Sequence, residues 1–413
     1  MRCWRRKCKL RKMQPRNYER KGQIQICRDE DMDAIKQVQL SDIAELITKG
    51  TTPTTLGYEF QDYGINFLKI ECFDENGNFI RSKVAHISEE CHEKLKRSQL
   101  KNGDILFSIA GAIGRVGIVT EEMLPANTNQ ALAIIRIVDE EVYLPYIKLI
   151  LTSPIVKKQF EKKKQGVAQL NLSLKDINEI TIPLPGKEKQ IELTALFEKV
   201  ADIIDKKNIE LKLLDELIKS RFVEMFGNPE LNEKGWIQGR LGDYCRVING
   251  RAYKAEELLS AGKYKVLRVG NFFTNENWYY SDLELESDKY CDFGDLLFAW
   301  SASFGPKIWD GDKTIYHYHI WKLDDYTENL NKNFFVEHLN YNCEIMKRST
   351  HGSTMAHFTK GQMEDQVMVI PPMELQKQFA VFVEQIDKSK FKVQKSLEET
   401  QLLMDALMQK YFG

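Results

Sequence analysis

The longest hydrophobic pattern in the chain predicts a single long helix over Gln190–Phe226. Pro183 and Pro185 precede the pattern, and Gly227 and Pro229 follow it, as expected at the two ends of a helix. At 1.5 Å per residue, a helix of about 36 residues is about 54 Å long, which exceeds the width of a small domain. Its apolar positions recur every three or four residues, as in an amphipathic helix: Leu193, Leu196, Val200, Ile203, Leu211, Leu214, Ile218, Phe222 and Met225.

A second pattern of the same kind predicts a long helix over Lys377–Tyr411. It also follows two prolines, Pro371 and Pro372, and we align its first residues so that Gln378 matches Gln190. Its apolar positions are Phe379, Phe382, Ile386, Val393, Leu397, Leu403, Leu407 and Tyr411.

We expect these two helices to pair side by side within one molecule. Each apolar stripe is interrupted by a polar residue, Lys207 in the first helix and Ser389 in the second. Such residues can act as register markers in a helical seam.

Shorter patterns before each long helix repeat in the same order. Gly103-Asp-Ile-Leu-Phe corresponds to Gly294-Asp-Leu-Leu-Phe, and Phe67-Leu-Lys-Ile corresponds to Val266-Leu-Arg-Val. Each run predicts a short strand, and short helical patterns lie between the strands. The opening run of the first half predicts a short helix capped by Ser41 or Asp42. The fold class is therefore mixed α/β (α+β), with one scaffold used twice.

These patterns divide the chain into five segments. We expect a basic leader over residues 1–34, globular domains over 35–185 and 228–372, and long helices over 186–227 and 373–413. The leader lacks a hydrophobic period, so we interpret it as disordered, as upstream sequence before a true start at Met32, or as a basic arm that contacts DNA.

Composition limits the class of protein without identifying it. Formal net charge is −1, so any nucleic-acid binding must come from local patches rather than from a basic chain. The eight cysteines show no Cys-x-x-Cys pair, which favours reduced thiols. Neither a signal-peptide pattern nor a long apolar run is present, so we expect a cytoplasmic protein without a membrane segment.

Motifs of catalysis and cofactor binding are missing from the sequence. There is no Asn-Pro-Pro-aromatic motif of amino-methylating enzymes, no phosphate-binding glycine loop before a helix, and no cysteine–histidine cluster with metal spacing. His317 and His319 lie two apart, which would put both rings on one face of a strand. We interpret them as surface or ligand-facing residues, with a metal pair as the alternative.

Polar loops of the first domain offer groups that contact nucleic acid. Lysine and arginine bind phosphates, amides bind base edges, and glycines let the backbone approach closely. For any one residue, the alternative is an ordinary turn or solvated loop position. The candidates are Ser108, Gly111, Gly114, Arg115, Asn127, Asn129, Gln130, Lys162, Lys163, Gln165, Gln169 and Asn171.

The second domain carries polar loops at matching places, and this recurrence supports the set as a whole. The residue types differ from those of the first domain, so we expect it to read a different sequence. The candidates are Arg268, Asn271, Ser301, Ser303, Phe304, Lys307, His317, His319, Ser353, Thr354 and His357.

With both halves compared, residues 35–413 resemble the specificity subunit of Type I restriction–modification enzymes. The resemblance rests on the duplicated Gly-Asp strand, the Ile182-Pro-Leu-Pro entry with Ile370-Pro-Pro, the glutamines at the helix starts, and Met225-Phe-Gly-Asn-Pro. Each motif is short, but their order and duplication are specific. The second domain departs from the pattern at Trp300-Ser-Ala-Ser-Phe-Gly305 and Gly352-Ser-Thr-Met-Ala-His357.

The resemblance implies two target-recognition domains separated by two long antiparallel, coiled-coil-like helices. Each domain would read half of a bipartite target in double-stranded DNA, as part of a bacterial defence system. The chain would dock two modification (methyltransferase) subunits and restriction subunits, and would itself be non-catalytic. S-adenosylmethionine, ATP and magnesium would belong to those partner subunits, with no cofactor in this chain.

Two other functions remain open from the residues alone. One is a self-contained DNA methyltransferase or nuclease with fused recognition domains, which binding of S-adenosylmethionine by the pure chain would support. The other is a coiled-coil adaptor that binds only proteins. Steep dependence of DNA affinity on salt separates a true DNA reader from such an adaptor.

Overall fold

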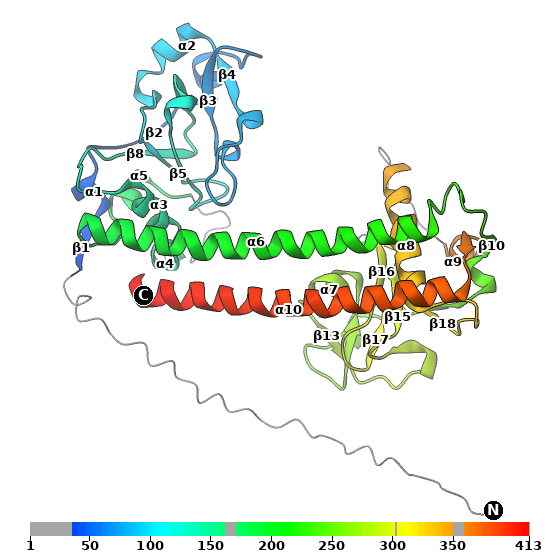
Figure 1. The fold of residues 1–413 in the computed structure, drawn as a ribbon. Helices are drawn as coiled ribbons and strands as arrows, with labels where there is room; N and C mark the ends of the chain where they lie inside the picture. The colour runs from blue at the N-terminus through cyan, green and yellow to red at the C-terminus, as the bar shows by residue number, and fades with distance from the viewer. Residues whose placement is uncertain (1–34, 162–170, 302–303, 350–358, 413) are drawn as a thin grey trace, which may run out of the picture. The chain divides into compact units, whose positions relative to one another are not determined.

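The structure is a computed structural model, and it describes residues 35–161, 171–301, 304–349 and 359–412. The chain divides into two compact units (Figure 1). Unit 1 comprises the residues up to Lys199 together with Met404–Gly413, and unit 2 comprises Val200–Leu403. Among the described residues, no helix is long and apolar enough to cross a membrane.

Unit 1 contains two small sheets, and residues from both sheets pack together in one buried hydrophobic cluster. The first has the order β2-β8-β5-β6 and is antiparallel, and the second has the order β4-β3-β7. The pair β3–β7 is parallel whereas β3–β4 is antiparallel, so the second sheet is mixed. The strands are β2 (Leu46–Lys49), β3 (Ile65–Leu68), β4 (Ala85–Ile87), β5 (Ile105–Ser108), β6 (Val116–Ile118), β7 (Ala126–Thr128) and β8 (Leu132–Arg136).

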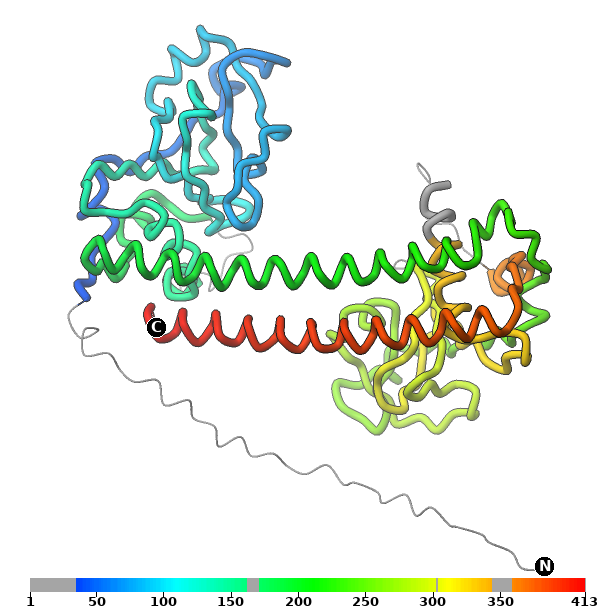
Figure 2. The backbone as a smooth tube through the Cα atoms, viewed as in Figure 1, coloured from blue at the N-terminus to red at the C-terminus, as the bar shows by residue number. Residues whose placement is uncertain are grey.

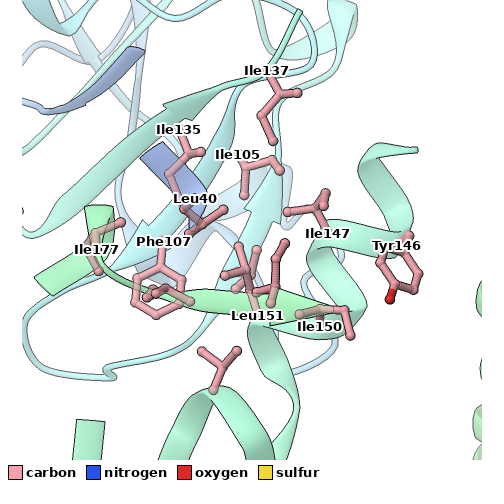
Figure 3. Close-up of a cluster of buried hydrophobic side chains, with 14 of the residues drawn as sticks. Leu40, Ile105, Phe107, Ile135, Ile137, Tyr146, Ile147, Ile150, Leu151 and Ile177 are labelled. Atoms are coloured by element: carbon pink, nitrogen blue, oxygen red, sulfur yellow. The ribbon is translucent and has the colours of Figure 1, made fainter. Parts of the chain in front are cut away.

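Helices cover one face of the first sheet in unit 1. Phe107 and Ile135 from the sheet pack with Ile147 and Leu151 in one buried cluster (Figure 3). All four side chains are almost completely buried, and burial of this kind stabilises a fold by about 2 kcal/mol per large side chain. The helices of this unit are α1 (Leu40–Ile43), α2 (Glu89–Lys94), α3 (Leu144–Thr152), α4 (Pro154–Glu161) and α5 (Leu174–Asn178), of which α2 packs on β3 and β4 of the second sheet instead.

Unit 2 repeats this topology with the corresponding strands. Its sheets have the orders β11-β18-β15-β16 and β13-β12-β17-β14, and the β12–β17 pair is again parallel. The extra strand β14 (Tyr290–Cys291) lies beside β17. The other strands are β11 (Arg246–Asn249), β12 (Tyr264–Leu267), β13 (Tyr279–Ser281), β15 (Leu296–Ala299), β16 (Gly305–Ile308), β17 (Thr314–Tyr316) and β18 (Ile320–Asp324).

The core of unit 2 is rich in aromatic rings. Phe222 stacks on Phe334 at 5.6 Å between ring centroids, and Phe226 meets Phe379 edge to face at 5.4 Å. Such pairs add to the apolar burial of the same rings. Besides the long helices, this unit contains the helices α7 (Val269–Thr274), α8 (Lys332–Ser349) and α9 (Lys360–Glu364).

A two-stranded ribbon leads into each long helix. In unit 1, β1 (Lys36–Gln39) pairs with β9 (Thr181–Leu184), and in unit 2, β10 (Ile237–Arg240) pairs with β19 (Val367–Ile370). Both pairs are antiparallel. The first strand of each domain therefore closes against the strand that precedes the long helix.

The two predicted long helices are present, and each begins earlier than the apolar pattern indicated. They are α6 (Lys187–Phe226) and α10 (Met373–Phe412), continuous along the backbone trace (Figure 2). Within unit 1, Phe197 stacks on Phe412 at 5.2 Å.

Within unit 2, polar contacts between the two helices show that they run antiparallel. Asp215 forms an ion pair with Lys390 at 2.6 Å, and Lys207 Nζ donates to Ser396 Oγ at 2.8 Å. Lys207 therefore meets Ser396 rather than Ser389, whose hydroxyl donates to Gln385 O within its own helix.

A buried glutamine fixes the start of each long helix. Gln190 Oε1 accepts from Tyr143 N, and its Nε2 donates to Pro185 O and Glu141 O. In unit 2, Gln376 makes the same three bonds with Asn331 N, Pro371 O and Asn329 O.

The sequence alignment that matched Gln190 to Gln378 is therefore wrong by two positions. Gln378 is exposed, while Gln376 is fully buried. Lys-Gln occurs at Lys189-Gln190 and at Lys377-Gln378, so sequence similarity favoured the wrong glutamine.

The repeated Gly-Asp motif also has the same structural role in both units. Gly103 and Gly294 adopt φ values of 83° and 88°, which favour glycine. The buried Asp104 pairs with Arg136 through two hydrogen bonds of 2.7 Å, and Asp295 pairs with Lys322 at 2.8 Å. The hydrogen bonds that Arg136 donates to Asp104 raise the pKa of its guanidinium. The motif thus ties the turn before the central strand to the neighbouring strand.

The predicted cap of the first helix is wrong. Gln39 is the N-cap of α1, and Asp42 lies at the third helical position, where its carboxylate accepts from Gln39 N at 3.0 Å. Ser41 is exposed inside the helix. The helix therefore starts two residues earlier than a Ser41 cap would place it, and three earlier than an Asp42 cap.

Candidate nucleic-acid interface

Three segments of unit 1 meet where strands end, and we call them loop cluster 1. They are Gly50–Thr52 after β2, Ile109–Arg115 between β5 and β6, and Asn129–Ala131 between β7 and β8. Thr51 N donates to Thr128 O at 3.0 Å, and Ile109 N donates to Ala131 O at 2.9 Å. Main-chain hydrogen bonds therefore hold the three segments together.

Gly50 makes this junction possible. A Cβ at Gly50 would lie 2.1 Å from Thr128 O and 2.4 Å from Asn129 O, far inside the permitted approach. The strand exit and the β7–β8 loop can touch only because this position has no side chain.

Unit 2 builds an equivalent loop cluster 2 from Gly250–Tyr253, Trp300–Ser301 and His317–His319. Arg251 N donates to Tyr316 O at 3.0 Å, and Trp300 N donates to His319 O at 3.1 Å. A Cβ at Gly250 would lie 2.4 Å from His317 O, which is the same restriction as at Gly50. The two halves therefore place different side chains on one backbone arrangement.

Loop cluster 1 presents amide and hydroxyl groups. Gln130 is exposed, and its Oε1 accepts from Thr52 N at 3.1 Å and from the Thr52 hydroxyl. Its Nε2 donors have no partner among the described residues. Asn129 Oδ1 accepts from Ala131 N at 3.1 Å, which shapes the loop. Gln130 is thus a fixed amide with free donors, a group suited to base edges.

Other candidates of unit 1 lie around the same loops. Gly111 and Gly114 have φ values of 72° and 85°, so they form the turn between β5 and β6. Arg115 at the end of this turn donates to Phe73 O at 3.3 Å. Leu172 N donates to Ile109 O at 2.9 Å, which places the exposed Asn171 beside the turn.

Burial removes three predicted residues from the candidate interface. Ser108 is fully buried and its hydroxyl donates to Ala110 O at 2.9 Å. Asn127 is fully buried and donates to Leu95 O at 3.1 Å. Asn271 is buried as well, and its side chain accepts from Arg268 N at 2.7 Å and donates to Val266 O. These amides and this hydroxyl satisfy backbone groups, so they cannot contact a ligand.

The two histidines of unit 2 lie in a turn, so the strand spacing assumed for them is wrong. His317 follows β17 and His319 precedes β18, yet their rings are adjacent at 4.8 Å between centroids. Burial, together with the smaller effects of the charges of His319 and Arg268, lowers the pKa of His317 to about 4. His317 is therefore neutral near pH 7 and offers hydrogen bonds rather than a positive charge.

The remaining described candidates of unit 2 are held by neighbouring groups. The Arg268 guanidinium lies 5.2 Å from the Tyr279 ring, and Lys307 forms an ion pair with Asp310 at 3.2 Å. Phe304 packs edge to face on the core residue Phe298 at 5.1 Å. Ser301 is half-buried directly after Trp300. Their contact with DNA stays a prediction.

Eight predicted residues lie outside the described residues, and for them the prediction stands untested. They are Lys162, Lys163, Gln165, Gln169, Ser353, Thr354 and His357, together with Ser303. The basic leader over residues 1–34 also lies outside the described part of the chain.

Residues that the sequence did not single out complete both clusters. Thr52 holds Gln130 in unit 1, and in unit 2 Arg251 forms two bonds with Glu257, at 2.7 and 2.9 Å. The hydrogen bonds from Arg251 lower the pKa of Glu257 to about 2. A glycine at the end of a strand in both halves, at Gly50 and Gly250, is the signal that could have found them.

No group of three or more histidine, cysteine, aspartate or glutamate side chains arranged to hold a metal ion occurs within the described ranges. The arrangement of both clusters instead suits recognition: exposed amide and aromatic groups on loops fixed by main-chain bonds.

Comparison with known proteins gives the family. The profile of the Type I restriction modification DNA specificity domain matches residues 32–213 and 233–401. The EcoBI specificity subunit of Escherichia coli is 31% identical over 221 residues, a match that covers 48% of this chain and 46% of that subunit. The MjaIX specificity subunit of Methanocaldococcus jannaschii is 22% identical over 399 residues, covering 90% of this chain and 91% of that one.

Solved structures agree at the level of the fold. A chain from a structure of the type I R-M system, described for its complex assembly and conformational transition, superposes with a TM-score of 0.59 at 16% identity, covering 91% of this chain and 97% of that one. The type I S subunit from M. genitalium has a TM-score of 0.52 at 13% identity, covering 94% and 98%. With the family profile matched in both halves, this chain belongs to the Type I restriction modification DNA specificity family.

Proposed function

We propose that loop cluster 1 and loop cluster 2 each read one block of a bipartite target in double-stranded DNA. The observation that carries the proposal is the repeated loop arrangement, in which Gly50 and Gly250 hold equivalent loops with different exposed side chains. One scaffold with two sets of contact groups is suited to two different base sequences.

We assign no catalytic reaction to this chain. We propose that it is the non-catalytic specificity subunit of a cytoplasmic complex and that two modification subunits and the restriction subunits join it. Those subunits would bring S-adenosylmethionine, ATP and magnesium. The absence of a methylating motif from the sequence supports this division of labour.

A selection experiment tests the proposal. The full chain, assembled with the modification subunit from the same host, is incubated with random duplexes, and the retained DNA is sequenced. We expect two short specified blocks around a gap of fixed length. We also expect affinity to fall steeply with salt, because phosphate contacts release counterions.

Two outcomes would contradict the proposal. Retained duplexes without any shared sequence would favour an adaptor that binds protein. A single uninterrupted block would mean that only one loop cluster reads DNA. Binding of S-adenosylmethionine to the chain alone would instead support a self-contained methyltransferase.

A further inference from the structure

Loop cluster 2 contains an exposed ring that loop cluster 1 lacks. Tyr318 is the central residue of the loop between β17 and β18, and its side chain is 40% exposed. In the equivalent loop of unit 1, the exposed central residue is Gln130. The same position therefore carries an amide in one half and an aromatic ring in the other.

The Tyr318 ring is held in place by other rings. Its centroid lies 4.0 Å from that of His319, 4.5 Å from that of His317 and 6.1 Å from that of Trp300. A ring packed on several sides loses little conformational entropy when it binds, which is a property of residues that dominate interfaces.

The backbone of Tyr318 is fixed as well. Tyr318 N donates to Arg251 O at 3.1 Å, and its own carbonyl accepts from Trp300 Nε1 at 2.9 Å. The loop therefore presents the ring in one orientation before any ligand arrives.

Among the described residues near Tyr318, two arginines are held by neighbouring side chains. Arg251 is committed to Glu257 through two hydrogen bonds, and Arg268 lies over Tyr279. The aromatic ring carries no positive charge of its own, so it is not itself a phosphate-binding group. It is well suited to apolar contact with a base edge, and in the major groove the thymine methyl group is the apolar feature.

We propose that Tyr318 reads a thymine in one block of the DNA target through contact between its ring and the thymine C5-methyl group. The inference rests on the proposed function. It adds that the two blocks are read by different chemistry, with amide hydrogen bonds at Gln130 and apolar contact at Tyr318.

Replacement of thymine by uracil tests this contact, because uracil keeps every hydrogen bond and lacks only the methyl group. The assembled complex is titrated with duplexes in which each thymine of one block is replaced in turn. For one thymine we expect affinity to fall about three- to fivefold, the order expected for one buried methyl group.

The variant Y318A should bind more weakly and should no longer distinguish thymine from uracil at that position. Y318F should still distinguish them, because it keeps the ring. F293A is the matched control, since Phe293 is 78% exposed and lies before β15, whereas Trp300 follows that strand. We expect F293A to retain wild-type affinity and the full thymine preference.

Several results would overturn the inference while leaving the proposed function intact. They are a split target whose blocks contain no thymine, affinity unchanged by uracil at every position, or thymine preference retained in Y318A. Absence of any split target would instead contradict the proposed function itself.

Discussion

One buried glutamine in each half fixes the start of its long helix. Each glutamine makes two hydrogen bonds to the segment before an earlier helix of its unit, α3 for Gln190 and α8 for Gln376, and a third to the proline carbonyl just before its own long helix. Sequence could indicate that glutamines matter at these helix starts, but it could not tell Gln376 from Gln378. The deciding property is burial, which depends on segments more than forty residues away in sequence.

Q376A should destabilise unit 2 by about 3 kcal/mol, because one N–H and two carbonyl groups lose their buried partner. Q378A is the matched control, and we expect its free energy of unfolding to stay within about 0.5 kcal/mol of wild type because Gln378 is exposed. Urea unfolding of the two variants measures the difference. Equal stability of both would contradict the role of Gln376.

We expect protonation of His338 to lower the stability of unit 2 in acid. Burial lowers its pKa to about 4, and its Nε2 accepts a hydrogen bond from Val369 N at 3.3 Å. The folded state thus favours neutral imidazole, so this contribution is complete above the unfolded pKa of about 6.5 and is lost as pH falls through 4.

The contribution amounts to about 3 kcal/mol between those limits. Unfolding measured at several pH values between 7.5 and 4.5 should show a smaller decrease for H338Q than for wild type, because glutamine does not titrate. A parallel pH dependence of the two proteins would refute the assignment to His338.

At the scale of elements, hydrophobic periodicity predicted the helices and strands that are determined by local sequence. The long helices followed from apolar spacing, and the duplicated strands followed from the Gly-Asp runs, because both patterns repeat within a short stretch of chain. The loop clusters could not be predicted in this way. Gly50 meets Thr128, and Arg251 meets Tyr316, across long stretches of sequence, so burial of Asn127 and exposure of Gln130 were equally compatible with the sequence.

G250A should displace the loop that carries His317–His319, because the added Cβ would lie 2.4 Å from a backbone oxygen. We expect DNA affinity to fall about tenfold, as for the loss of one or two base contacts. G270A is the control, since a Cβ at Gly270 meets nothing within 4 Å. Fluorescence anisotropy with the selected target measures both, and wild-type affinity of G250A would contradict the role of the loop.

At the scale of the whole molecule, duplication is the organising feature. Apart from the extra strand β14 in unit 2, the two units have the same strand order, the same ribbon before a long helix, and the same glycine-dependent loop junction. Because the exposed side chains differ between the units, we expect the two blocks of the target to be read independently. A change in one loop cluster should therefore alter one block and leave the other as it was.

Mapping of methylated bases across a host genome tests this claim most directly. The host carries the modification partner and either no copy of this gene, the wild-type gene, or the variants G50A and G250A. We predict one split methylation motif with the wild-type gene and none without it, and each variant should relax a different block. Identical methylation with and without the gene, or relaxation of the same block by both variants, would contradict the account.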